Sequence, residues 1–288
     1  DNKLCKNLKE SLKHVDFHGP TNLESIHITG ESLHDASKRI VDNLLHVDSF
    51  SFVSVEQKNY WMGMFSCAGF NPDLIDASIV NLALPLYESA YTVESKVRFV
   101  FAGGWHPWLV DEGILLETAD LIDAENNAEL HFLGGAHTFC DQKYLSLVKL
   151  LKNKESIFFH GFLPHNKFLS FMDQSTCALD LFSKSFESKI AVSTRTVEFI
   201  NNSIPVVHPA WSCLSNVFRK SGCGFVYEDK KDLFEIVKFI SRCPTKLKVA
   251  SALSKKAVQE NFNFENARNS LCRALNKFVP EISSHNRP

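Results

Sequence analysis

Residues 187–209, ESKIAVSTRTVEFINNSIPVVHP, decide the fold of this chain. Residues 194–200 are predicted to form a helix, because the polar cluster at 201–203 that follows them is a natural stop. The apolar run at 204–207 then predicts a buried strand of a parallel sheet. A helix followed at once by such a strand is one αβ unit of an α/β fold, and the rest of the chain is interpreted around it.

Arg195 and Glu198 carry the chemistry of this unit. The helix directs its N-terminal amides and Arg195 to a place where an anion can bind. The carboxylate of Glu198, one turn further, can accept hydrogen bonds from vicinal hydroxyls, which together predicts a nucleotide-sugar site. The spacing also leaves an ordinary αβ unit open, in which Arg195 forms a surface salt bridge with Glu187 or Glu198 and Glu187 is a solvated loop carboxylate.

The totals are those of an ordinary globular protein long enough for two domains, with 288 residues, 44% of them hydrophobic and 22% charged. A net charge of -2 gives no reason to expect nucleic acid or a polybasic membrane anchor. No apolar run reaches the length of a transmembrane helix. Asp1 cannot be a natural initiator, so we expect a chain that lacks its natural start.

The cysteines and short motifs exclude several classes of site. Eight cysteines are scattered without a CxxC pair, which is typical of a reducing cytosol and not of a disulfide framework or a zinc site. The sequence contains no HExxH, P-loop, GxGxxG or nucleophile-elbow motif. We therefore expect neither a bound metal nor a cofactor, and a cytoplasmic location.

Strands and helices alternate along most of the chain, which predicts a parallel sheet with covered faces. The strands are predicted at 47–55, 76–84, 97–102, 130–133, 156–159, 177–182, 204–207 and 224–227. Such sheets bind ligands outside the carboxyl ends of their strands. Gly103-Gly104, Gly134-Gly135, His160-Gly161 and residues 184–187 fall at such ends.

The turn after the strand at 97–102 combines glycine with tryptophan. Gly103 and Gly104 suit close backbone approach to a ligand phosphate or sugar, although a plain tight turn explains them equally. Trp105 and Trp108 could stack on a sugar face or cap the core. His160 lies near a later strand end and could face a ligand, although an exposed loop histidine is the more common case.

The order of these segments resembles that of a known family. FAGGWHPWLVDEG, LHFLGG, FFHGFLPHNKFLSFM, CALDLFSKSFESKIAVSTRTVEFINNSIPVV and CGFVYEDKKDL follow one another between residues 101 and 233. This succession resembles the donor-binding half of GT-B glycosyltransferases of group 1, which are family 4-like. FSFVSVEQKNYWMGMFSCAGFNP, at 50–72, resembles the end of their acceptor-side domain.

The resemblance implies an α/β fold of GT-B type with two Rossmann-like domains. Residues 1–90 would be an incomplete N-terminal acceptor-side domain, whose opening βα units lie before Asp1. Residues 91–262 would be the C-terminal domain that binds the nucleotide-sugar donor, and residues 263–288 a C-terminal helix and tail.

The resemblance also implies a role for individual residues of the first loops. Gly103 and Gly104 match the loop that approaches the donor phosphates and sugar, and Trp105 and Trp108 line it. The segment from His160 to Leu163, which includes Phe162, matches the loop whose backbone contacts the nucleotide base.

In the opening stretch, Glu198 matches the carboxylate that holds the ribose hydroxyls, and Arg195 is the candidate for the diphosphate. The family's Glu-x7-Glu motif would need an acid at position 190, where Ile190 stands. Glu187 is the nearest acid and, with Arg195, is our catalytic candidate. Lys189 lies beside it, and Lys184 or Lys189 is expected to contribute positive charge to donor binding.

The predicted function is that of a hexosyltransferase which moves a sugar from a nucleoside-diphosphate sugar to an acceptor hydroxyl. The resemblance implies a retaining, metal-independent reaction on a carbohydrate or lipid-linked acceptor, in surface polysaccharide or glycolipid synthesis, with peripheral contact to the inner membrane face. One alternative is a non-catalytic nucleotide-sugar or carbohydrate-binding protein, which Ile190 favours. Another is a sugar isomerase of double-Rossmann shape, which would need a carboxylate and histidine pair facing the sugar.

Overall fold

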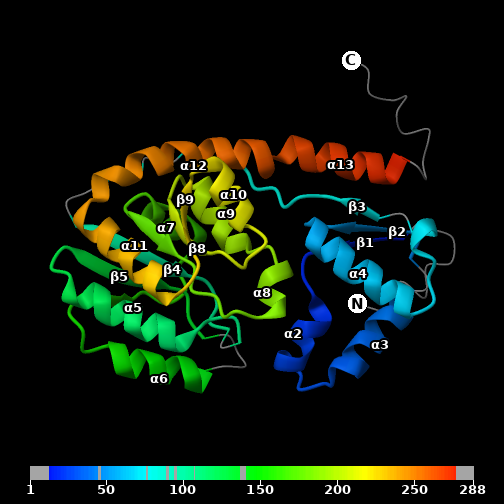
Figure 1. Ribbon diagram of the computed structural model, residues 1–288, viewed down its shortest axis with the longest axis horizontal. Coiled ribbons are helices and arrows are strands. Elements are labelled where there is room, and N and C mark those ends of the chain that lie inside the picture. The colour runs from blue at the N-terminus through cyan, green and yellow to red at the C-terminus, as the bar shows by residue number, and fades with distance from the viewer. Residues whose placement is uncertain are drawn as a thin grey trace, which may run out of the picture. The chain divides into compact units, whose positions relative to one another are not determined.

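The chain forms two compact units in the computed structural model, which describes residues 13–44, 47–75, 77–88, 91–93, 96–106, 108–136 and 141–276 (Figure 1). The first unit comprises the described residues of Asp1–Ala83, Ile190–Val192 and Phe262–Pro288. The second comprises those of Leu84–Lys189 and Ser193–Asn261. Each unit is built on a parallel sheet, as the alternation of strands and helices predicted.

The first unit contains a parallel sheet of three strands in the order β1-β2-β3. Its elements are β1 (His14–Phe17), α2 (Thr21–Ile28), α3 (Leu33–Leu44), β2 (Ser49–Phe52), α4 (Val55–Cys67), η1 (Pro72–Leu74), β3 (Ala77–Ile79) and α13 (Phe264–Asn276). An aromatic core of Phe17, Phe50, Phe52, Trp61 and Phe65 joins the strands to α4. The C-terminal helix α13 contacts β2 and β3, so it is part of this unit.

The second unit contains a six-stranded sheet whose neighbouring strands all run parallel. Its elements are β4 (Val97–Ala102), α5 (Glu112–Ala124), β5 (Ala128–Leu133), α6 (Asp141–Leu151), β6 (Ile157–Phe159), α7 (His165–Met172), β7 (Cys177–Leu179), α8 (Phe186–Ile190), α9 (Thr194–Asn201), β8 (Val206–Pro209), α10 (Ser215–Ser221), β9 (Gly224–Tyr227), α11 (Lys230–Arg242), η2 (Pro244–Lys246) and α12 (Leu247–Asn261). The strand order is β6-β5-β4-β7-β8-β9. The chain therefore winds outward in one direction from β4 and in the other from β7, so the topological switch point lies between these two strands.

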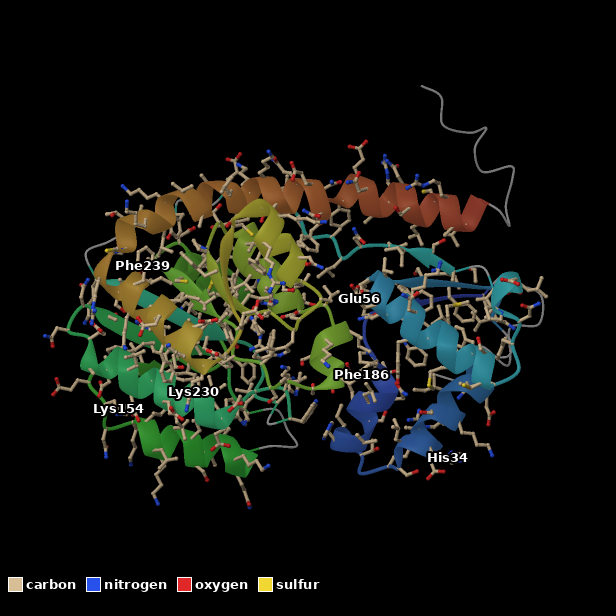
Figure 2. All side chains as sticks on the ribbon, viewed as in Figure 1. His34, Glu56, Lys154, Phe186, Lys230 and Phe239 are labelled. Atoms are coloured by element: carbon tan, nitrogen blue, oxygen red, sulfur yellow. The ribbon has the colours of Figure 1, made fainter. Side chains whose placement is uncertain are left out.

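Helices cover both faces of the six-stranded sheet. Apolar side chains of α5, α6 and α11 pack on one face with the core residues of the strands, while α9, α10 and α12 form the layer on the other face (Figure 1). On the outer surface of the first layer, Lys230 of α11 pairs with Glu117 of α5, with 2.9 Å between Nζ and Oε2 (Figure 2). Within the described residues, no helix combines the length and the apolar character that crossing a membrane requires.

Of the eight predicted strands, β4 and β9 have the predicted bounds and the other six differ, and β8 and β7 show two physical causes. β8 begins at Val206 rather than at 204, because the Ile204 amide still closes the end of α9 by donating to the Phe199 carbonyl. β7 ends at Leu179 rather than at 182. Beyond it the chain turns away from the sheet, and Phe182 forms an antiparallel bridge with Val110 instead.

Helix α8 was not predicted, since residues 184–187 were interpreted as a strand-end loop. Ser185 and Ser188 start this helix by exchanging hydrogen bonds, each backbone amide donating to the other residue's hydroxyl at 3.0 Å. This is a capping box in which a serine takes the place of the usual Glu or Gln. The helix carries an exposed Phe186 (Figure 2) and a buried Glu187.

Candidate functional site

Glycines end the three strands on one side of the switch point. Gly103 follows β4 with φ 105°, Gly134 follows β5 with φ 118°, and Gly161 follows β6 with φ 67°. Their backbones continue the parallel ladder, since the Gly103 amide donates to Leu133 and the Gly134 amide to Gly161, both at 2.7 Å. A Cβ atom on Gly134 would lie 2.1 Å from the Gly103 carbonyl oxygen. The absence of side chains therefore brings backbone groups to the carboxyl edge of the sheet.

Arg195 reaches this edge from the opposite side of the switch point. It lies in the first turn of α9, whose N-cap Ser193 accepts a hydrogen bond from the Thr196 amide at 3.2 Å. A Cβ atom on Gly103 would lie 3.1 Å from Cζ and Nε of Arg195. The guanidinium also lies over the rings of Phe101 and Phe182, 5.4 and 5.9 Å from their centroids.

The charge of Arg195 is partly desolvated. Its Nη1 atom is buried and has no hydrogen-bond partner among the described residues. Burial lowers the pKa of Arg195, and the carboxylate of Asp180 opposes this effect. Since the guanidinium remains charged in proteins, this arrangement holds a cation with an unused donor at the switch point. Within the described residues, Nη1 therefore donates no hydrogen bond to Glu187 or Glu198, the two partners of the surface salt bridge that the spacing left open.

Glu198 lies one turn after Arg195 on α9 and is half-buried. Its backbone carbonyl accepts a hydrogen bond from the Asn202 side chain at 2.8 Å, which helps to end the helix. The predicted helix at 194–200 is thus observed, with Arg195 and Glu198 three residues apart on it.

The tryptophans of the glycine turn have separate environments. Trp105 is 2% exposed, belongs to the hydrophobic core and bridges to Ala136 in the next strand-end loop, so the core alternative describes it. Trp108 is half-buried, and its Nε1 donates to Oε1 of Glu187 at 3.4 Å. The structure therefore brings Trp108 and Glu187 together and buries Trp105 in the core.

Glu187 is 5% exposed, which contradicts the alternative of a solvated loop carboxylate. Lys189 is exposed on the same short helix α8, and Ile190 is buried. Lys184, the other lysine that could supply positive charge, lies over the ring of Trp211 at 5.7 Å. Of the predicted cations, Arg195 is the one that the structure holds against Gly103.

The loop after β6 presents both an aromatic ring and a histidine pair. Phe162 is 68% exposed, and its ring lies 3.2 Å from the place of a Cβ on Gly135, so this loop contacts the neighbouring glycine turn. Leu163 is half-buried. His160 is exposed but bonded, because 2.9 Å separates its Nε2 from Nδ1 of His131.

His131 continues this chain of hydrogen bonds to Glu129 on β5, with 2.9 Å between Nε2 and Oε2. Burial lowers the pKa of both His131 and His160, and the Glu129 carboxylate opposes the shift at His131. Neutral imidazoles are therefore the favoured forms at neutral pH.

Sequence reasoning missed a buried cluster around Asp180, just after β7. Oδ2 of Asp180 accepts hydrogen bonds from Oγ1 of Thr196 at 2.6 Å and from Nδ1 of His208 at 2.8 Å. Asp180 is 1% exposed, and Thr196 and His208 are fully buried. The available signal was an acid and a histidine at the ends of apolar strands, where a buried charge requires partners. No three His, Cys, Asp or Glu side chains within the described ranges form a group that could hold a metal ion.

Several solved structures are similar to this chain in fold. Among solved structures, TarM of S. aureus superposes with a TM-score of 0.73 and 12% identity over 95% of this chain. HepE of Anabaena, in complex with UDP and glucose, superposes with a TM-score of 0.73 and 13% identity over 96% of this chain. Sucrose-phosphate synthase from Thermosynechococcus elongatus superposes with a TM-score of 0.72 and 12% identity over 96% of this chain. The matches cover 52% of TarM, 76% of HepE and 71% of the synthase, so this chain spans about half the length of TarM.

These neighbours share the GT-B fold, which confirms the predicted fold class. A search of curated protein sequences returned no match. A family model described as glycosyl transferase-like matches residues 114–271, which is more than half of the chain and includes Arg195 and Glu198. This chain belongs to the glycosyl transferase-like family.

Proposed function

We propose that this chain binds the diphosphate of a nucleoside-diphosphate sugar at the carboxyl edge of the six-stranded sheet, as part of an enzyme that transfers the sugar to an acceptor hydroxyl. The observation that carries the proposal is Arg195, held against Gly103 at the switch point with Nη1 buried and unbonded within the described residues. Burying a cation whose hydrogen-bond donor has no partner costs free energy unless an anion binds beside it. A diphosphate is such an anion.

The chemistry follows from where charge develops. As the sugar leaves, negative charge accumulates on the diphosphate, and Arg195 and the first amides of α9 would stabilise it. Gly103 permits close approach because it has no side chain at this point. In this proposal the guanidinium supplies the positive charge of the step, and transfer is metal-independent and retains the anomeric configuration, as the resemblance implies.

UDP is the first nucleotide to test, because HepE is described in complex with UDP and with UDP-glucose, and TarM in a complex that contains UDP. Glu198 is our candidate for the ribose hydroxyls. Phe162 and Leu163 are candidates for the base, since Phe162 is exposed at a strand end beside Gly135. We propose a hexose as the sugar, and a carbohydrate or lipid-linked acceptor of surface polysaccharide or glycolipid synthesis.

A second candidate is a nucleotide-sugar-binding protein without transferase activity. Two observations favour it: Ile190 is buried where the resemblance implies an acid, and the buried Glu187 is engaged by Trp108. On this alternative the Arg195 site would be retained, but no group would promote the departure of the diphosphate from the sugar.

Calorimetry with UDP, GDP and UDP-glucose tests the site, and an assay of UDP release from UDP-glucose separates the two candidates. We expect the wild-type chain to bind UDP, and Arg195→Ala to weaken binding by about tenfold or more. Arg219→Ala, which removes an exposed arginine paired with Glu228, is the matched control. Equal UDP affinity of Arg195→Ala and the wild type would refute the site. Binding without UDP release would favour the binding protein.

A further inference from the structure

The cluster of Asp180, Thr196 and His208 is buried, and its Thr196 directly follows Arg195 of the proposed diphosphate site. Asp180 follows β7, His208 belongs to β8, and Thr196 belongs to the first turn of α9. The His208 ring lies 4.7 Å from that of Phe218 in a stacked arrangement, which fixes its orientation. Three elements that are distant in sequence thus meet at one carboxylate oxygen.

The hydrogen bonds within the cluster define the role of each group. Two groups, the Thr196 hydroxyl and Nδ1 of His208, approach Oδ2 of Asp180 at 2.6 and 2.8 Å. A carboxylate oxygen that receives both is an acceptor, so the threonine hydroxyl and the imidazole Nδ1–H are donors. Hydrogen bonds to an ionised carboxylate are about twice as strong as neutral ones, which makes this a firm connection between α9 and the sheet.

The hydroxyl of Thr196 lies in the first turn of α9, so no earlier turn of that helix offers it a carbonyl. Threonine in a helix commonly donates to a carbonyl of the preceding turn. Thr118 in α5 does this, donating to the Ile114 carbonyl at 2.7 Å. Thr196 donates across to β7 instead. Because Thr196 follows Arg195 directly, this bond holds the turn that carries the guanidinium.

We propose that Asp180, Thr196 and His208 are positioning residues that hold the first turn of α9, and with it Arg195, where the arginine meets the donor diphosphate. This inference rests on the proposed function of the same site. The negative charge of Asp180 has a second effect, since it offsets part of the cost of burying the Arg195 cation before an anion binds. Oδ1 of Asp180 is buried without a described partner, as is Nη1 of Arg195.

The test compares two buried threonines of the same unit. Thr196→Val removes the hydroxyl that reaches Asp180, and Thr196→Ser restores it. Thr118→Val removes an equally buried hydroxyl that bonds only within its own helix. With UDP as the probe in calorimetry, we expect Thr196→Val to weaken binding about tenfold, and Thr196→Ser and Thr118→Val to bind within about twofold of the wild type. Melting temperatures establish that each variant is folded.

A double-mutant cycle asks whether Thr196 acts through Arg195. In the Arg195→Ala background, Thr196→Val should weaken UDP binding by much less than in the wild type, because only the amides of the first turn remain to be held. If Thr196→Val does not fold, His208→Leu replaces it, and His208→Asn, which keeps a donor in place of Nδ1, becomes its control. Wild-type protein that binds neither UDP nor GDP would refute the proposed function and this inference with it. Suppose instead that the wild type binds UDP. The positioning role alone would then be overturned if Thr196→Val bound UDP as tightly as the wild type, or if Thr196→Val weakened binding equally in the Arg195→Ala background.

Discussion

The two halves of the six-stranded sheet end in different ways at the carboxyl edge. On one side of the switch point, β4, β5 and β6 end in Gly103, Gly134 and Gly161, all with positive φ. On the other side, Asp180 follows β7 and the turn before β8 belongs to α9, which carries Arg195. The half with β4, β5 and β6 therefore offers backbone groups at this edge, and the half with β7 and β8 offers charged side chains.

Under the proposed function, this difference would allow one edge to hold a large anion. Missing side chains allow a ligand to approach backbone amides closely, but glycines supply no charge. Arginine supplies charge and directional donors, but it needs a fixed position and partners for its burial. Gly103 and Arg195 meet at the switch point, and this is where the two requirements are combined.

Among the predicted changes, Gly134→Ala should have the largest effect on stability, and it acts on the half of the edge that ends in glycines. The new Cβ would lie 2.1 Å from the Gly103 carbonyl oxygen, at a φ of 118° that side chains rarely adopt. Strain and steric overlap together should lower the free energy of unfolding by about 4 kcal/mol, measured by urea denaturation. Gly113→Ala in α5 is the control, since its Cβ meets nothing closer than 3.5 Å, and it should stabilise by up to about 1 kcal/mol. Equal stability of the two variants would contradict the close packing of the strand-end loops.

Arg195→Ala should remove the charge that acts on the diphosphate in the other half of the edge, with little effect on folding. Loss of one charged donor to the departing diphosphate should lower turnover by about 100- to 1000-fold, measured as UDP release from UDP-glucose with saturating donor. The free energy of unfolding should change by less than about 1 kcal/mol, because a buried cation is removed together with its contacts. Full turnover in Arg195→Ala would remove Arg195 from the proposed mechanism.

Gly103→Ala should affect both halves of the edge at once, since Gly103 lies against Arg195. Its Cβ would lie 3.1 Å from Cζ and Nε of Arg195, so the guanidinium must shift by a few tenths of an ångström. We expect UDP affinity to fall about tenfold. The loss of stability should be smaller than in Gly134→Ala, because the new Cβ overlaps with a side chain and not with a backbone atom. If UDP affinity is unchanged, the contact between Gly103 and Arg195 has no part in binding.

The smallest expected effect is a pH dependence of stability that arises in the glycine half. Burial lowers the pKa of His131, so the unfolded chain binds more protons than the folded one as pH falls below about 6.5. The free energy of unfolding should therefore decrease with falling pH between pH 7 and 5. His131→Gln keeps a donor toward Glu129 without titrating and should flatten this decrease in urea denaturation. An identical pH profile in both proteins would exclude His131 as its source.

The fold could be predicted because its signals are local. The strand at Val97–Ala102, the strand at Gly224–Tyr227 and the helix that carries Arg195 were recognised from apolar runs and polar stops. Errors arose where a tertiary contact decided the outcome. The end of β7 depends on the bridge between Phe182 and Val110, and α8 depends on a pair of serines that bond each other's amides.

The candidate site was predictable only in part for the same reason. Glycines at strand ends and an arginine at a helix start can be recognised in a sequence, because the backbone geometry of each is local. The environment of Trp105 could not be recognised, since the same turn serves a buried or an exposed indole. The carboxylate–histidine pair of Asp180 and His208 joins residues 28 positions apart and requires the register of two parallel strands.

Local sequence patterns were therefore enough to predict a parallel α/β architecture, the strand-end glycines and the helix that begins with Thr194 and Arg195. Periodicity, turn residues and helix stops act over a few residues, so they can be interpreted without knowing what lies opposite. Only the tertiary structure decided that Arg195 lies against Gly103 and that Thr196 bonds Asp180, because strand order and register bring these residues together. Burial, which gives those charges their effect, exists only once the sheet and its helices have packed.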